Sequence, residues 1–451
     1  MSEVALASLR ELAGSELYRR NAFRVTGLPA DADRRTARHR QQRLAAALQV
    51  GAEVDGDGSA VRLEDLPAAF DVVLGDPRRR LVHEVFAVWG PPAGCRCSPG
   101  LHRDHDIAVR AHAEALDATL AALTGTGPVD RADPDRVPDG WSTAAAAWTK
   151  TLRSAAFWRH LHHRVKALDD RQLDASIVDV LRAELPGVLV RPLLTLAASV
   201  PHPAPLRKRL DGWPVSAKQL DRLVEEIAEP AYAEFDAIVD DLHRRLESGD
   251  VDGTLREMRD RAKPVLARIT GLAPSKRHRR TAAARDRAAV LLNNCALARH
   301  RATRRYDRRV RAWLREAEKL ATEPENLRRI RENHEGFEAL EEFRAKVEEI
   351  ELTQGSRTAR LFLRSILGQV TNEPLADAIR DMLTELEAGT PIGYARRVAG
   401  PVWQAATGGR RRRVAAVAIV CVVLALAYVL HQSGDGGPDA GRGHQHEVVW
   451  R

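Results

Sequence analysis

The sequence predicts a mainly α-helical protein, and three observations support this fold class. Aromatic residues make up only 5% of the 451 residues, whereas alanine, leucine and arginine are abundant. Helices favour these three residues, while strands favour β-branched and aromatic ones. Apolar residues also recur at intervals of three and four in several segments, as on the buried face of a helix. With 44% apolar and 29% charged residues, the composition fits folded domains, roughly two to four of them at this length.

The cysteine content and the N-terminus both indicate a cytoplasmic protein. Four cysteines, at positions 95, 97, 295 and 421, are too few and too scattered for a disulfide framework. Such usage is typical of a reducing compartment. The first twenty residues contain three glutamates and lack a basic segment followed by an apolar core, so they do not resemble a cleaved signal peptide. We therefore expect the bulk of the chain to stay in the cytoplasm.

A candidate membrane anchor lies near the C-terminus. Residues 414–430 are seventeen consecutive residues without a charge. As a helix they extend about 26 Å, close to the ~30 Å hydrocarbon core of a bilayer. A buried core helix is the alternative, but it has no need of the arginines that precede this segment, and such flanks stay on the cytoplasmic side. The pattern predicts a single-pass protein of the cell membrane, its N-terminal bulk cytoplasmic and its short hydrophilic tail outside. The topology-setting arginines are Arg410, Arg411, Arg412 and Arg413.

The N-terminal 92 residues form the first predicted domain. A short helix is expected to end at Gly27, and a basic helix to occupy about residues 30–48. After a polar loop, a third helix is expected to end at Gly75, followed by a break at Asp76-Pro77 and a further short helix. Apolar positions at helical spacing in the third helix predict core, and these are Leu66, Phe70, Val73 and Leu74.

Two segments of this domain have a family resemblance. Residues 21–32 (NAFRVTGLPADA) and 69–80 (AFDVVLGDPRRR) resemble the two most recognisable stretches of a J domain, the Hsp70-stimulating module of DnaJ proteins. In that family a His-Pro-Asp tripeptide follows the second helix and is required for stimulation. Here its place is held by Gln49-Val50-Gly51 and an Asp-Gly loop. The resemblance therefore implies a degenerate J-like domain over residues 15–90, which docks an Hsp70-type chaperone or its client without the stimulating tripeptide.

The predicted basic helix supplies a candidate partner-binding surface. In J domains a face of this kind meets an acidic partner, so the resemblance implies the same role here. A solvated helix face is the alternative. The arginines of this face are Arg34, Arg35, Arg38, Arg40 and Arg43.

A cluster of metal-binding residue types follows the J-like domain. Two cysteines and two histidines lie within eleven residues, and they are Cys95, Cys97, His102 and His105. Two thiols and two imidazoles match the donor types of tetrahedral zinc, although the spacing is not that of a common zinc module. We expect no cofactor, with zinc left open as the alternative. Three histidines further on, His160, His162 and His163, are interpreted as surface residues of an arginine-rich helix, with metal binding again as the alternative.

The middle of the chain is predicted to be helical. Residues 128–140 form a linker rich in proline, glycine and aspartate, and helix is expected from Trp141 to Val200. An aromatic and apolar core stripe is predicted along the start of that helix. Its members are Trp141, Trp148, Leu152, Ala155, Trp158 and Leu161.

The most basic part of the chain lies between residues 276 and 315. This stretch holds fourteen lysines and arginines against two acidic residues, a net charge of +12, so the rest of the chain sums to −4. It predicts two antiparallel helices, joined near residue 303, that weakly resemble a tetratricopeptide repeat. We expect these helices to pack against the acidic helix predicted over residues 324–352. The alternatives are a nucleic-acid or anionic-lipid surface. The candidate binding residues here are Arg304, Arg305, Arg308 and Arg309.

The sequence contains no nucleotide-binding glycine loop, nucleophile elbow, zinc-protease helix or kinase signature, so we expect no enzyme. The best hypothesis is a membrane-tethered cytoplasmic adaptor, similar to a co-chaperone, that docks a protein partner through its J-like domain. A membrane-tethered nucleic-acid-binding protein is the alternative. The predicted domains are 1–92 (J-like), 93–127 (Cys/His segment and helix), 128–270 (helical), 271–352 (basic pair and acidic helix), 353–409 (juxtamembrane helices), 410–431 (membrane span) and 432–451 (disordered tail).

Overall fold

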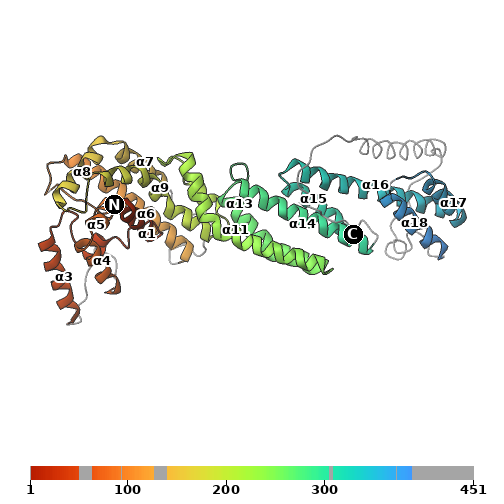
Figure 1. Cartoon of the computed structure of the whole chain (residues 1–451), viewed down its shortest axis with the longest axis horizontal. Helices are drawn as coiled ribbons and strands as arrows, with labels where there is room; N and C mark the ends of the chain where they lie inside the picture. The colour runs from red at the N-terminus through yellow and green to blue at the C-terminus, as the bar shows by residue number, and fades with distance from the viewer. Residues whose placement is uncertain are drawn as a thin grey trace. The chain divides into compact units, whose positions relative to one another are not determined.

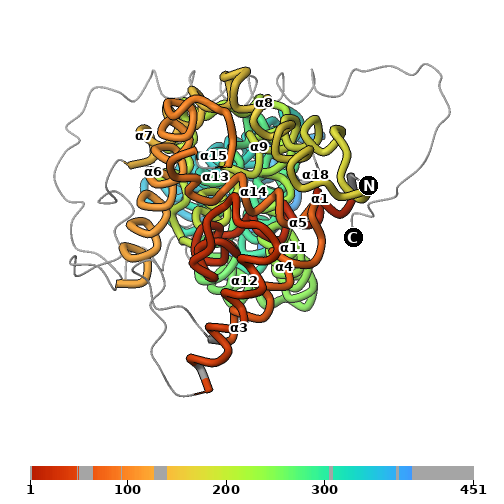
Figure 2. The backbone as a smooth tube through the Cα atoms, turned by 90° about the vertical axis from the view of Figure 1, so that its left-hand side faces the viewer, coloured from red at the N-terminus to blue at the C-terminus, as the bar shows by residue number. Residues whose placement is uncertain are grey.

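The computed structural model describes residues 2–49, 63–92, 94–125, 140–303, 308–371 and 373–388. These residues are mainly helical and contain no strand, which confirms the predicted fold class at that level (Figures 1 and 2). They belong to two compact units. The first is Met1–Ala302 with Ala312–Ile330, and the second is Thr303–Arg311 with Arg331–Arg451.

The first predicted domain forms the short helices that its sequence predicts. A short left-handed turn at Gly27, with φ of +64°, ends the second helix, where the glycine has no Cβ to oppose that conformation. Asp76 caps the fifth helix by accepting a hydrogen bond from the Arg78 backbone N–H at 2.8 Å, and Pro77 occupies the first helical position. The helices are α1 (Ser2–Leu12), α2 (Ala22–Thr26), α3 (Arg34–Gln49), η1 (Leu63–Asp65), α4 (Leu66–Leu74) and α5 (Pro77–Val85).

The next four helices build an aromatic core. α6 (Pro99–Thr124) packs along α7 (Gly140–Arg153), and α8 (Ala155–Leu168) and α9 (Ser176–Ser199) follow. Trp141 and Trp148 are fully buried, as predicted. Trp158 and Leu161 are buried as well, but the single continuous stripe is wrong, because the helix is interrupted at Ser154 and Ala155 is exposed.

The rest of the first unit is a set of helices joined by ion pairs. They are α10 (Ala204–Lys208), α11 (Ala217–Glu247), α12 (Val251–Glu257), the π-helical turn η3 (Met258–Ala262), α13 (Lys263–Leu272), α14 (Arg279–Thr303) and α15 (Arg308–Leu320). Arg285 of α14 donates hydrogen bonds to the carbonyls of Lys319 and Leu320 at 2.7 and 3.1 Å. Arg299, near the other end of α14, lies over the Trp313 ring. The start of each helix thus meets the end of the other, as the predicted antiparallel pair requires.

The acidic neighbours of the basic stretch are the predicted ones only in part, because Arg311 pairs with Glu338 of α16 at 4.0 Å while earlier arginines pair elsewhere. Arg277 pairs with Asp221 at 2.9 Å, Arg280 with Glu229, and Arg287 with Asp236 and Asp240. All four carboxylates belong to α11, and their numbers rise with those of the arginines, so α11 and α14 run in the same direction. We call these contacts the α11–α14 ladder. The prediction that residues 324–352 supply the acidic partners is therefore wrong for Arg277, Arg280 and Arg287.

The described helices of the second unit have their own small core. These helices are α16 (Pro324–Gln354), most of which belongs to this unit, α17 (Ser356–Leu367) and α18 (Glu373–Glu387). Val347 is fully buried among residues of α17 and α18, with Leu340, Phe343 and Ile350 packed against the same cluster.

Several predicted features lie outside the described residues. They are the loop at 50–62, the predicted linker at 128–140 except for Gly140, Arg304 and Arg305, the span at 414–430 with Arg410 to Arg413, and the tail at 432–451. Within the described part, no helix combines the length and apolar character needed to cross a bilayer.

Candidate functional site

The two cysteines of the Cys/His segment lie between two anchored ends. Before them, the Trp89 indole donates a hydrogen bond to the Glu84 carbonyl at 2.8 Å, and the backbone N–H groups of Trp89 and Gly90 donate to the Asp106 carboxylate at 2.7 and 3.0 Å. After them, Ser98 caps α6 by accepting from the Gly100 N–H at 3.2 Å. The intervening residues are therefore held against α6 at both ends.

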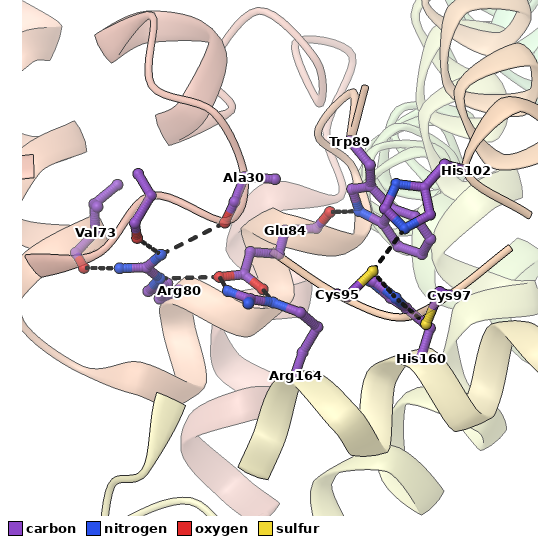
Figure 3. A network of polar contacts seen from close by, with 11 residues as sticks. Ala30, Val73, Arg80, Glu84, Trp89, Cys95, Cys97, His102, His160 and Arg164 are labelled. Atoms are coloured by element: carbon purple, nitrogen blue, oxygen red, sulfur yellow. Dashed lines mark hydrogen bonds and ion pairs between the residues drawn. The ribbon is translucent and has the colours of Figure 1, made fainter. Parts of the chain in front are cut away.

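Both thiols of this segment face histidines (Figure 3). Cys97 Sγ lies 3.3 Å from His160 Nδ1, and Cys95 Sγ lies 3.9 Å from the same nitrogen. One donor atom each from Cys95, Cys97, His160 and His163 lie within 4.8 Å of one another. We call these four residues the Cys/His cluster. His160 is only 4% exposed, and α8 supplies both histidines.

The structure separates the two histidines that were grouped with these cysteines from sequence. His102 borders the cluster, with Nε2 lying 3.3 Å from Cys95 Sγ and Nδ1 lying 2.9 Å from the Gly90 carbonyl. His105 is fully buried elsewhere: its Nε2 bonds the Val85 carbonyl at 2.8 Å and its ring stacks on Trp89. His105 therefore acts as a core side chain and does not reach the cluster.

Sequence analysis missed the role of α8. It interpreted His160 and His163 as surface residues, yet His160 is buried and both face the cysteines. Their spacing of three residues was the available signal, because it places two side chains on one helix face. What the sequence could not show is that this face meets a segment 63 residues earlier in the chain.

The cluster has the electrostatics of neutral donors. Burial, helped by the nearby His102 and Arg164, lowers the pKa of His160 to about 3, so its imidazole is neutral at physiological pH. Burial likewise raises the pKa of the Cys97 thiol. Two sulfur and two imidazole donors could together hold one tetrahedral metal ion.

A buried ion network lies beside the cluster and is shown in the same view (Figure 3). Glu84 of α5 accepts hydrogen bonds from Arg80 at 2.9 Å and from Arg164 of α8 at 3.0 and 3.1 Å. All three residues are at most 9% exposed. Arg80 also donates to the carbonyls of Ala32 and Ala30, at 2.5 and 3.5 Å. The network therefore joins α5, α8 and the loop that leads into α3.

The predicted basic face of α3 is exposed. The helix contains five arginines and no acidic residue, and it turns Ala37 and Leu44 inward. Arg34 donates to the Leu74 carbonyl at 3.3 Å and Arg40 to the Thr26 carbonyl at 3.1 Å. Because a carbonyl carries no net charge, these hydrogen bonds do not neutralise either guanidinium. The exposed members that make neither of these contacts are Arg35, Arg38 and Arg43.

Electrostatic neutralisation of this face is slight. The hydrogen bond from the Thr36 N–H is the main cause that lowers the pKa of Asp33, and the charge of the neighbouring Arg35 contributes to the same lowering. Within the described residues, no α3 arginine forms an ion pair with a carboxylate. α3 packs against α4 at the edge of its unit (Figure 1). Positive charge on α3 is therefore available to a partner.

The second predicted basic site is only partly visible. Arg308 and Arg309 are exposed at the start of α15. They belong to the second unit, whereas α3 belongs to the first.

No protein-family model, curated protein or solved structure matches this chain.

Proposed function

We propose that this chain is a helical docking protein that binds an acidic surface of a partner protein through α3. The observation that carries the proposal is the charge of that helix: five arginines, no acidic residue, and no ion pair to a carboxylate among the described residues. Such a surface attracts an acidic partner and speeds its association.

The way α3 is mounted supports this role. Asp33 accepts a hydrogen bond from the Thr36 N–H at 2.7 Å, which caps the start of the helix. Immediately before it, Arg80 binds the Ala30 and Ala32 carbonyls from within the buried network. The base of α3 is thus fixed, while its arginines face outward. A rigid base limits the ordering cost of binding.

The resemblance to a J domain directs the choice of partner. We propose an Hsp70-type chaperone or its client as the first partner to test, docked without the tripeptide that stimulates the ATPase. The sequence-predicted span at 414–430 lies outside the described residues, and in this proposal it tethers the docking helix at the cytoplasmic face of the cell membrane. The chain then acts as an adaptor rather than as an enzyme.

The α11–α14 ladder weighs against the nucleic-acid alternative. Arg277, Arg280 and Arg287 from the basic stretch bind carboxylates of α11, so those charges are already partly neutralised. A phosphate-binding surface needs arginines that are free to replace counterions.

In-cell crosslinking tests the proposal. A photoreactive residue replaces Gln42, which is exposed on α3, in the full chain. We expect a nuclease-resistant protein adduct that disappears when Arg35, Arg38 and Arg43 are all changed to Gln. The control changes three exposed arginines of the same unit, Arg110, Arg153 and Arg222, to Gln, which removes the same charge and should leave the adduct in place. Equal adducts from both triple variants would contradict docking through α3, and a nuclease-sensitive adduct would favour nucleic acid.

A further inference from the structure

We propose that the Cys/His cluster binds one zinc ion, with Cys95, Cys97, His160 and His163 as its four ligands. This site is independent of the docking role of α3. The ligands come from two places in the chain, the segment before α6 and one face of α8.

The donor distances fit a single tetrahedral ion. Bonds of about 2.3 Å to sulfur and about 2.0 Å to nitrogen place neighbouring ligand atoms roughly 3.3 to 3.8 Å apart. The distances from His160 Nδ1 to the two sulfurs are 3.3 and 3.9 Å, and no pair among the four donors exceeds 4.8 Å. Small movements of side chains suffice to close such a site.

The donor types select zinc. Two thiolates and two imidazoles in a tetrahedral arrangement are typical of zinc or of an iron–sulfur cluster, whereas calcium and magnesium take oxygen ligands. A cluster with two irons would separate its cysteine pair from its histidine pair. Here His160 contacts both cysteines, which favours one ion.

His163 is a better fourth ligand than His102. Its Nδ1 is buried and has no hydrogen-bond partner among the described residues, so an ion would satisfy an otherwise unpaired polar atom. His102 donates its Nδ1–H to the Gly90 carbonyl and turns its Nε2 toward Cys95 Sγ, but it is not among the four residues whose donor atoms all lie within 4.8 Å of one another. We therefore place His102 beside the ligand set, where its ring packs against Trp89 and lies next to Cys95.

The ion would have a structural role. Four protein ligands leave no position for a substrate, which is characteristic of structural zinc. The ion would join residues 63 positions apart, Cys97 and His160, directly beside the contact between Glu84 and Arg164. An open cavity bordered by Gly94, Arg96 and the cluster residues other than His160 gives the ion a route from solvent.

Metal analysis of the full chain, purified in detergent, tests the site. We expect about one zinc per chain, falling below about 0.2 in Cys97→Ser and in His163→Gln, because each variant removes a ligand. Two matched controls keep full zinc: His162→Gln, one position from His163 on the same helix, and Cys295→Ala, a buried free cysteine of α14. His102→Gln keeps the ion but binds it roughly 10- to 100-fold more weakly.

A second measurement does not depend on how the variants fold. Titration of the zinc-free wild-type chain with Co²⁺ should produce the visible bands of tetrahedral cobalt and a thiolate-to-metal charge-transfer band, saturating at about one ion per chain. Absence of both the zinc and these bands would overturn the proposal. Full zinc in His163→Gln together with loss in His102→Gln would overturn the assignment of the fourth ligand.

Discussion

Two arginine-rich helices of the first unit, α3 and α14, differ in whether their arginines form ion pairs with carboxylates. On α14, Arg280 binds Glu229, and Arg287 binds both Asp236 and Asp240. On α3, the arginines either bond backbone carbonyls or are exposed, and none pairs with a described carboxylate. From sequence, the stretch around α14 is the more basic one. In the structure, α3 offers more of its charge to a partner.

The difference shows that the net charge of a segment does not measure the charge available for binding. Fourteen basic residues between 276 and 315 give a net +12, yet part of that charge is neutralised by a helix some fifty residues earlier. The arginines of α3 have no such neighbour in the described chain. A third kind of arginine occurs in the network of Arg80, Glu84 and Arg164, where the arginines are buried and hold helices together.

The largest expected effect comes from the buried network beneath α3. Glu84→Gln keeps the side-chain shape but leaves Arg80 and Arg164 buried without a carboxylate. Breaking a buried pair in this way costs about 3–5 kcal/mol. Urea unfolding of the full chain measures the loss.

Asp117→Asn is the matched control for this change, because Asp117 pairs with Arg19 at 2.8 Å on the surface. An exposed pair contributes at most about 1 kcal/mol. Equal losses from Glu84→Gln and Asp117→Asn would show that the network does not hold the base of α3.

Acid should affect the contact between α2 and α5 before it affects the ladder. The His83 Nδ1 accepts the Ala22 backbone N–H at 3.0 Å, and burial, together with Arg79 and Arg20, lowers the pKa of His83 to about 4. In the unfolded chain His83 takes up a proton near pH 6.5, whereas in the folded chain it stays neutral down to about pH 4. The stabilising contribution of neutral His83 is therefore complete above pH 6.5 and is lost as the pH falls from 6.5 to 4. The loss amounts to ~3 kcal/mol in total.

His83→Gln should reduce the pH slope of unfolding free energy by about 1.4 kcal/mol per pH unit in that window. Burial also lowers the pKa of His112 to about 3. The unfolding free energy therefore keeps the part of its pH dependence that comes from His112 in the His83→Gln variant. The hydrogen bond from Arg280 lowers the pKa of Glu229, so the ladder keeps its carboxylate through the same window. An unchanged slope in His83→Gln would contradict the assignment.

A smaller effect is expected when the stability losses from single arginine changes in α14 and α3 are compared. Arg287→Gln removes contacts to two carboxylates of α11 and should cost about 1 kcal/mol, decreasing as salt is added. Arg38→Gln removes an equally charged side chain from α3, where it has no ion-pair partner among the described residues, and should change stability by less than about 0.5 kcal/mol. Thermal unfolding at low and high salt compares them, and a larger loss from Arg38→Gln would reverse the comparison.

Local structure was predictable from sequence where local residues determine it. Asn21 caps α2, Gly27 ends it, and Asp76 with Pro77 starts α5, all within a few residues of the helix that each one limits. Those boundaries follow from backbone preferences and capping, which a sequence displays directly.

Tertiary partners were not predictable in the same way. Charge complementarity favoured residues 324–352 as the neighbour of the whole basic stretch, but Arg277, Arg280 and Arg287 pair with α11, and Arg311 pairs with Glu338. The candidate metal site was likewise only partly predictable. The two cysteines are neighbours in the sequence, but His160 and His163 join them only because α8 folds against the preceding segment.

The most direct test of docking through α3 is the affinity of the crosslinked partner protein for three forms of the full chain. These are the wild type, the Arg35, Arg38 and Arg43 triple Gln variant, and Arg287→Gln, each measured at low and high salt. We expect at least a tenfold weaker affinity for the α3 variant, about 1.4 kcal/mol, a reduced salt dependence in that variant, and a change of less than about twofold for Arg287→Gln. Unchanged affinity in the α3 variant, or a greater loss in Arg287→Gln, would contradict the account.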